Sequence, residues 1–263
     1  MESETKKAVR IMAYQNMASY RVPSSLAIKE SYPLPPYSSV IGMVHAACGF
    51  QSYVPMQVSV QGKCKSHVSE LYTRYEFKPD TKYDEKEGRH QVCLQGRDKK
   101  LGMNRGVASI ELLVDVYLIL HIIPEDEAMI PVIAEGMLHP KNYLSLGRHE
   151  DLIRIDAVDI CELAWTELED SMVVPWDAYI PVEERNRLGF ASSATIYKLH
   201  KNYTIDPNLQ IRLWNSVRAQ FVKGGAASEI EEESMVWVDL TPIPEYINQK
   251  EYNLTSPMPV FGA

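Results

Sequence analysis

Two cations that precede a proline-rich helix start have the chemistry to bind phosphate. Arg21 and Lys29 lie shortly before a run in which prolines hold the chain extended. Within that run Ser38 or Ser39 can cap a helix, and Gly49 can end it. The first turn of a helix offers free backbone N–H groups, to which the two cations add positive charge. The pattern predicts either a phosphate site made of these cations and serines, or a capped core helix beside ordinary surface charges.

A second group of cations lies in a polar segment, residues 78–106. Residues 61–106 hold 11 Lys+Arg and 7 Asp+Glu, whereas the whole chain has 27 Lys+Arg, 35 Asp+Glu and a net charge of −8. A protein attracts phosphate by its local field, so this segment, too long for a simple turn, predicts an arm that contacts an anionic partner. A solvated surface would carry similar charges. The cations assigned to the arm are Arg89, Arg97, Lys99, Lys100 and Arg105.

The composition excludes several classes of protein. A chain of 263 residues that is 45% hydrophobic can bury a substantial core, and its longest apolar run, 112–123, contains Asp115 and His121, so no membrane span is expected. The four cysteines form no Cys-x-x-Cys pair, and the histidines lack metal-ligand spacing. No Gly-Lys-Ser/Thr ends the glycine-containing segment 96–106, which excludes a Walker loop. We therefore expect a cytoplasmic protein without metal or cofactor.

The elements that position these residues follow a recognisable order. The pattern predicts strands at 9–15, 56–62, 68–77, 110–123 and 152–163, with helices at 38–48 and from Pro124, the second one shortened or kinked by Pro131. The segments 56–62 and 68–77 form either a long hairpin or two strands. The order strand, helix, strand, strand, helix, strand is that of a ferredoxin-like α+β fold. Right-handed crossovers would place both helices on one face of an antiparallel sheet.

The last third of the chain carries a weaker pattern. Residues 196–203 and 235–240 have strand character, whereas 209–222 has helical spacing. We predict a ferredoxin-like domain at 1–165, interrupted by the arm at about 78–106, and a degenerate second subdomain at 166–263 packed on the first.

Two motifs resemble those of a known family. The first is Tyr20-Arg-Val-Pro followed by Tyr-Pro-Leu-Pro-Pro-Tyr-Ser-Ser-Val-Ile-Gly-Met-Val-His-Ala-Ala, and the second is the Leu-Gly-Arg segment within Tyr143–Leu152. In this order they resemble the CRISPR-associated "Cas five" family of the RAMP superfamily, and most closely its type I-B branch. The resemblance extends from about Val9 to about Trp165.

The resemblance implies a non-catalytic, RNA-binding subunit of the Cascade surveillance complex. Such a subunit caps the 5′ handle of the crRNA, inserts a thumb between nucleotides, and docks against the backbone subunit and the large subunit. It would meet target DNA only through the complex, because guide pairing reads the target. The RNA-binding residues assigned on the motifs and on charge are Tyr20, Arg21, Lys29, Ser38, Ser39, Arg89, Arg97, Lys99, Lys100, Arg105 and Arg148.

Two alternatives stay open. The first is a metal-independent endoribonuclease that cuts the CRISPR repeat, as type I-C relatives do with a Tyr and a neighbouring Lys-His pair. His45 would be its candidate general base, although His45 lies among Val44, Ala46 and Ala47, where packing is the other role. The chain contains no Lys-His dipeptide, and no Lys stands beside His121. The second alternative is an α+β interaction protein without an RNA role.

Overall fold

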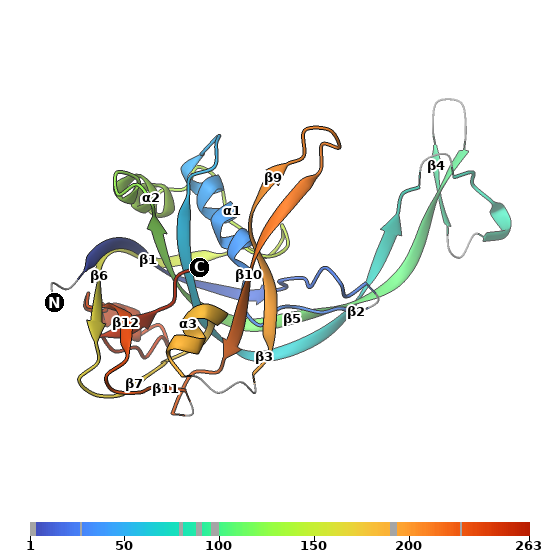
Figure 1. Ribbon diagram of the computed structural model, residues 1–263. Coiled ribbons are helices and arrows are strands. Elements are labelled where there is room, and N and C mark those ends of the chain that lie inside the picture. Colours follow the sequence, from blue (N-terminus) through green and yellow to red (C-terminus); the bar gives the residue numbers. More distant parts are fainter. Residues whose placement is uncertain are drawn as a thin grey trace.

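A curved antiparallel sheet dominates the computed structural model, which describes residues 4–26, 28–78, 81–87, 91–95, 100–189, 194–226 and 228–263 (Figure 1). Within these residues the main sheet has 11 strands in the order β13-β12-β6-β1-β5-β3-β8-β10-β9, with β2 and β4 paired to β5. Its strands are β1 (Thr5–Ala18), β2 (Ile28–Lys29), β3 (Met56–Glu76), β4 (Gln91–Gln95), β5 (Lys100–Pro124), β6 (Arg154–Glu167), β8 (Asp177–Pro181), β9 (Ile196–Ile205), β10 (Arg212–Val222), β12 (Met235–Asp239) and β13 (Met258–Val260). A small second sheet pairs β7 (Met172–Val173) with β11 (Glu229–Ile230). The helices are α1 (Tyr37–Cys48), η1 (Glu85–Glu87), α2 (Met129–Leu138), α3 (Val182–Arg187) and α4 (Glu245–Asn248).

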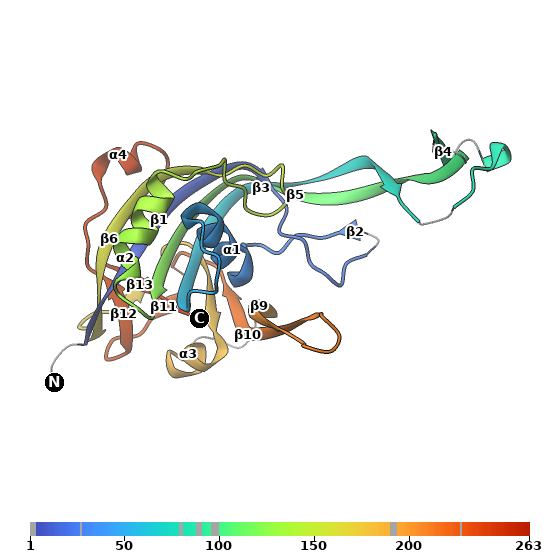
Figure 2. The same ribbon diagram turned by 90° about the horizontal axis from the view of Figure 1, so that it is seen from above.

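The four central strands and two helices hold the main core. β6, β1, β5 and β3 lie side by side and antiparallel, and the apolar run expected at 110–123 is confirmed as the inner part of β5. Figure 2 shows α1 and α2 on the same side of this sheet. Their apolar faces pack on one cluster with residues such as Val9, Val58 and Leu118. No helix among the described residues is both long and apolar enough to cross a bilayer.

The helix predicted at 38–48 is confirmed as α1, but its predicted cap is wrong. The N-cap is Pro36, in an extended conformation with ψ of 150°, and it makes no side-chain cap hydrogen bond. Because Pro36 fixes the helix start, Ser38 and Ser39 lie in the first turn. Gly49 ends α1 as expected, with φ of 70° and its N–H bonded to the carbonyl of His45.

The helix expected from Pro124 begins later than predicted. α2 starts at Met129, so the acidic residues 125–127 precede it, and Asp126 accepts a hydrogen bond of 3.0 Å from the Ala128 N–H. Pro131 lies in the first turn, where its missing N–H removes no helical hydrogen bond. Pro131 is therefore tolerated within α2.

The helix predicted at 209–222 is wrong, because this segment forms β10. β10 pairs antiparallel with β9 and β8. Val217, Ala219 and Phe221 alternate along β10 and pack on the main core, and a period of two residues places them on one face of a strand. The strands expected at 196–203 and 235–240 are confirmed as β9 and β12, and both extend the main sheet.

The predicted arm is a projecting β-ribbon (Figures 1 and 2). The segments 56–62 and 68–77 are one strand, β3, which pairs with β5 as far as Glu76 opposite Asn104. From Lys65 outward nearly every β3 side chain is exposed, so the ribbon leaves the body before residue 78. β4 adds a short third strand near the tip.

A buried ionic network joins the C-terminal part of the chain to the central strands. The Asp239 carboxylate on β12 accepts a bond of 2.8 Å from Arg10 on β1 and lies 3.0 Å from Nε2 of His121 on β5. All three side chains are fully buried. Burial raises the pKa of Asp239, but the hydrogen bond from His121 and the charges of His121 and Arg10 lower it below its ordinary value. The network therefore stabilises the position of β12 in the sheet.

Candidate nucleic-acid interface

Cations gather where the arm meets the body. The short strand β2 runs parallel to β5 and carries Lys29, whose ammonium lies 4.5 Å from the ring centre of Tyr72 on β3. Burial lowers the pKa of Lys29, and the nearby charges of Arg21, Arg74 and Arg148 lower it further. Mutual repulsion of this kind marks a region of positive potential that an anion would relieve. We call Arg21, Lys29 and Arg74 the basal cluster.

Two members of the basal cluster retain their charge for a ligand. Arg74 forms an ion pair with Glu76. Arg21 and Lys29 form no ion pair with any residue that the structure describes, and Arg21 is exposed on the surface. The backbone around them is fixed, because Arg21 pairs with Ser31 in an isolated bridge and the Ser31 N–H donates to Glu111 at 2.9 Å. Arg21 and Lys29, which the sequence analysis grouped as one phosphate site, lie close together in the structure, and Arg74 joins them although it was not among the predicted RNA-binding residues.

Arg148 lies close to this cluster but is held by carboxylates. Its guanidinium donates to the buried Asp151 at 2.6 Å and lies 3.0 Å from Glu150. The hydrogen bond that Arg148 donates to Asp151 is the main cause that raises the pKa of Arg148. Gly147 permits this turn, since its φ is 109° and a Cβ atom there would lie 2.9 Å from the Ser19 carbonyl. The Leu-Gly-Arg motif therefore builds a fixed loop, and an RNA contact by Arg148 stays a prediction.

The first turn of α1 lies between two cavities. Ser39 lines a cavity of about 330 Å³ shared with the loop 142–147, and Ser38 lines one of about 390 Å³ shared with β9 and β10. Gly42 lines both cavities. Both serines are half-buried, so they line the cavities without projecting from the surface.

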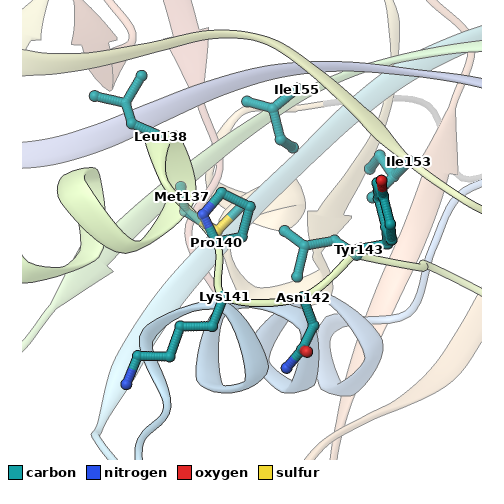
Figure 3. A pocket seen from close by; sticks show the side chains of 9 residues that line it. Met137, Leu138, Pro140, Lys141, Asn142, Tyr143, Ile153 and Ile155 are labelled. Carbon is teal, nitrogen blue, oxygen red and sulfur yellow. The ribbon is translucent and has the colours of Figure 1, made fainter.

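A third cavity, of about 560 Å³, continues along the loop that follows α2 (Figure 3). Lys141 and Asn142 point toward α1, and the apolar side chains of Met137, Ile153 and others line the opposite side. Tyr143 borders this cavity and its neighbour, and 96% of its side chain is exposed. An aromatic ring so exposed beside this loop offers a surface for a base or a partner side chain.

The arm carries exposed cations, of which only part can be placed. Lys100 and Arg105 are exposed on β5, and Lys100 lies 3.9 Å from Glu85. Arg89, Arg97 and Lys99 lie outside the described residues. The basal cluster lies at the foot of the same ribbon, because Arg74 is on β3 and Lys29 is on β2, which pairs with β5.

Tyr20 is buried in the protein interior, and His45 packs against neighbouring aromatic rings. Tyr20 is buried and its hydroxyl donates to Gln15 at 2.6 Å, so it supports the site from within. His45 lies parallel to Tyr53 at 5.8 Å between ring centres, and its Nε2 accepts the Val54 N–H at 3.4 Å. Burial lowers the pKa of His45. The nitrogen that would act as a base therefore faces the chain's own backbone.

One group of potential metal ligands occurs among the described residues. His121, Cys161 and Asp239 are buried together, with candidate ligand atoms within 4.8 Å of one another. Arg10 already contacts the same Asp239 oxygen that faces His121. Its guanidinium supplies the positive charge that a metal would bring, so these residues fit the ionic network better than a metal site.

Comparison with known proteins places this fold in a family. The family described as CRISPR-associated protein (Cas_Cas5) matches residues 9–200 of the chain. No curated protein matches the chain.

Two solved structures similar to this chain are the following. One chain of a CRISPR RNA-guided surveillance complex superposes with a TM-score of 0.51 at 15% identity, covering 92% of this chain and 97% of that one. A CRISPR protein from Archaeoglobus fulgidus has a TM-score of 0.41 at 8% identity, covering 89% and 95% of the two chains. The first likeness shows a shared fold over nearly the whole length of both chains.

Proposed function

Since this chain belongs to the CRISPR-associated protein (Cas_Cas5) family, we propose that it is an RNA-binding subunit of a type I CRISPR surveillance complex. In this role it caps the 5′ handle of the crRNA in the cytoplasm and contacts the backbone and large subunits of the complex. Target DNA meets it only through the assembled complex, in which base pairing reads the sequence.

The observation that carries the proposal is the basal cluster at the foot of a projecting ribbon. Lys29 lies against the Tyr72 ring and Arg21 is close to Lys29. Single-stranded RNA binds where cations follow its phosphates and planar groups meet its bases. The acidic remainder of the chain is compatible with this role, because the basal cluster and the arm concentrate the local positive potential.

We also propose three finer assignments that the sequence suggests, which concern the fold of the first part, the division of the chain and the subtype. The strand order β6-β1-β5-β3 with α1 and α2 on one face supports a ferredoxin-like description of the first part of the chain. The division into 1–165 and 166–263, and the type I-B subtype, stay predictions.

We propose that the subunit does not cut RNA. His45 is the candidate base, and its Nε2 lone pair accepts the Val54 N–H while its ring lies against Tyr53. A general base needs a free lone pair within reach of the 2′-hydroxyl proton. His45→Ala is therefore expected to leave RNA binding unchanged and to remove no cleavage product.

The proposal is tested by RNA binding at several salt concentrations. Fluorescence anisotropy would measure the affinity of purified protein for the repeat RNA of the CRISPR array of its own genome, and for duplex DNA of the same length. We expect tighter binding of the single-stranded RNA, with an affinity that falls as salt rises. Equal affinity for both nucleic acids, or none for the RNA, would refute the proposal.

A further inference from the structure

The cavity of about 390 Å³ between α1 and the β9–β10 hairpin has features that the basal cluster lacks. The two elements lie side by side in both ribbon views (Figures 1 and 2). The cavity is lined on one side by Ser38 and Tyr53, and on the other by Lys201, Tyr203 and Trp214. The volume is enough for a nucleobase and falls within the range of small-molecule sites.

A pair of stacked rings forms the hairpin side of this cavity. Trp214 lies against His200 at 4.7 Å between ring centres with an interplanar angle of 19°, and Tyr203 meets Trp214 edge-on at 5.1 Å. His200 is further fixed by its Nδ1 at 2.9 Å from the Ser216 hydroxyl. Trp214 nevertheless keeps 39% of its surface exposed and Tyr203 keeps 42%. Rigid rings that remain exposed form a stacking platform.

An irregularity in the hairpin sets the orientation of these side chains. The β9–β10 register shifts between Asn215 and Ser216, so Lys201 has no direct cross-strand partner. A bulge of this kind redirects neighbouring side chains. The Asn202 amide donates to the Tyr53 hydroxyl at 3.0 Å and so joins the hairpin to the opposite wall.

Two cations border the same cavity. The Arg212 guanidinium lies 4.5 Å from the ring centre of Tyr203 and 5.9 Å from that of Trp214. Lys201 lines the cavity as well, and burial lowers its pKa. None of the described residues that line the cavity carries a carboxylate. Stacked rings flanked by cations favour a base with its phosphates over an apolar protein segment.

We propose that this cavity binds one nucleobase of single-stranded RNA, which stacks on Trp214 while Arg212 and Lys201 contact its flanking phosphates. The inference rests on the proposed RNA-binding function and adds a second, base-stacking contact to it. Ser38 and the Tyr53 hydroxyl are placed to meet the edge of the base.

The test uses the full-length protein and the repeat RNA carrying 2-aminopurine at one position at a time. Stacking quenches the fluorescence of this base, so we expect strong quenching at one position and little elsewhere. Trp214→Ala should abolish that quenching and raise the Kd between about fivefold and 100-fold, as the loss of one stacked base does. Trp214→Phe should retain most of both, because a ring remains.

Matched variants separate this contact from the rest of the surface. Tyr246→Ala removes another exposed ring, on α4, and should change neither Kd nor quenching. If Arg21→Ala weakens RNA binding while Trp214→Ala has no effect at any labelled position, the stacking site is refuted and the proposed function stands. If the wild-type protein binds no RNA, both are refuted. If Trp214→Ala impairs only co-purification with other subunits, the cavity is a protein contact and the inference is wrong.

Discussion

Among single residues, Arg21 and Lys29 are the cations of the basal cluster that form no ion pair with any residue the structure describes. Arg21 and Lys29 can be recognised in the sequence because they flank the proline-rich helix start. Arg74 cannot, because only the pairing of β3 with β5, and of β2 with β5, brings it near them. The same limit applies to the ion pair of Arg148 with Asp151. The two residues are near in sequence, but Asp151 is also bonded by the N–H of Ser19, which follows β1 and is far away in sequence.

Arg21→Ala and Lys29→Ala should each weaken RNA binding and reduce its salt dependence. Loss of one phosphate contact lowers the slope of log K against log salt by about 0.7 for a single strand. Anisotropy titrations at four salt concentrations would measure this slope. Lys7→Ala, which removes an exposed cation at the opposite end of β1, is the control and should leave the slope unchanged. Equal slopes for all three variants and the wild type would exclude the basal cluster as the phosphate site.

Glu184 on α3 should make stability depend on pH. Burial raises the pKa of Glu184 from 4.5 to about 7, although Arg187 and Lys6 lower it. The folded state therefore binds more protons than the unfolded state between these values, and this group's contribution destabilises the fold as pH rises from 4.5 to 7. Glu184→Gln should be more stable than the wild type by on the order of 2–3 kcal/mol at pH 8, and equally stable near pH 4.5. Urea unfolding at both pH values would measure the difference, and a constant difference would contradict the assignment.

At the scale of elements, the arm should be separable from the body. Glu76 and Asn104 are cross-strand partners, so an Asn-Gly turn can replace residues 77–103 and close the ribbon. From Lys65 outward the ribbon buries few β3 side chains, so its removal should cost little stability. The melting temperature of the truncated protein should lie within about 2–4 °C of that of the wild type, which corresponds to a change of roughly 1 kcal/mol in the free energy of unfolding. Its RNA affinity should fall.

A full-length variant distinguishes charge from length in the arm. Lys100→Ala combined with Arg105→Ala keeps the ribbon and removes two exposed cations. It should reproduce part of the loss of affinity and flatten the salt dependence. Affinity equal to that of the wild type in both the truncated and the substituted protein would exclude the arm as an RNA contact.

The buried ionic network should be the most sensitive link between elements. Asp239→Asn leaves Arg10 and His121 buried without their shared carboxylate, which typically costs about 3–5 kcal/mol. Asp159→Asn is the matched control, because Asp159 contacts the same guanidinium at 3.1 Å but is 26% exposed, and it should cost less. Because the pKa of Asp239 is lowered on folding, the stability it contributes is present above its unfolded pKa and is lost as pH falls. Urea denaturation would measure each loss, and equal losses would contradict the role of the network.

Element prediction succeeded where local signals were strong and failed where tertiary pairing decided. The apolar run in β5 and the Gly49 end of α1 are local signals, and both were predicted. β10 was predicted as a helix because its apolar residues occur at helical spacing. The same residues fit a strand that is apolar on both faces: Phe221 packs on the main core, and Val222 on the opposite face belongs to a second buried cluster. The start of α2 was missed because Pro131 acts within the first turn and not at its first residue.

Over the whole molecule, the order of strands and helices could be predicted better in the first two thirds of the chain than in the last third, where β9 and β12 were predicted but β10 and the pairing of these strands were not. The strand and helix order up to β6 follows from periodicity. The C-terminal strands add to both sides of the same sheet, β12 beside β6 and β8 beside β3, and such pairings join residues that are far apart in sequence. The stacking cavity was missed for the same reason, because Ser38 and Trp214 meet only after β9 and β10 have packed beside α1.

The most direct test of the account is to incubate the purified protein with labelled repeat RNA in EDTA and to follow both mobility and length on a gel. We expect a shifted complex in which the RNA stays intact, and the same result for His45→Ala. A discrete product formed without metal would contradict it and identify an endoribonuclease, while the absence of a shift would remove the RNA-binding role.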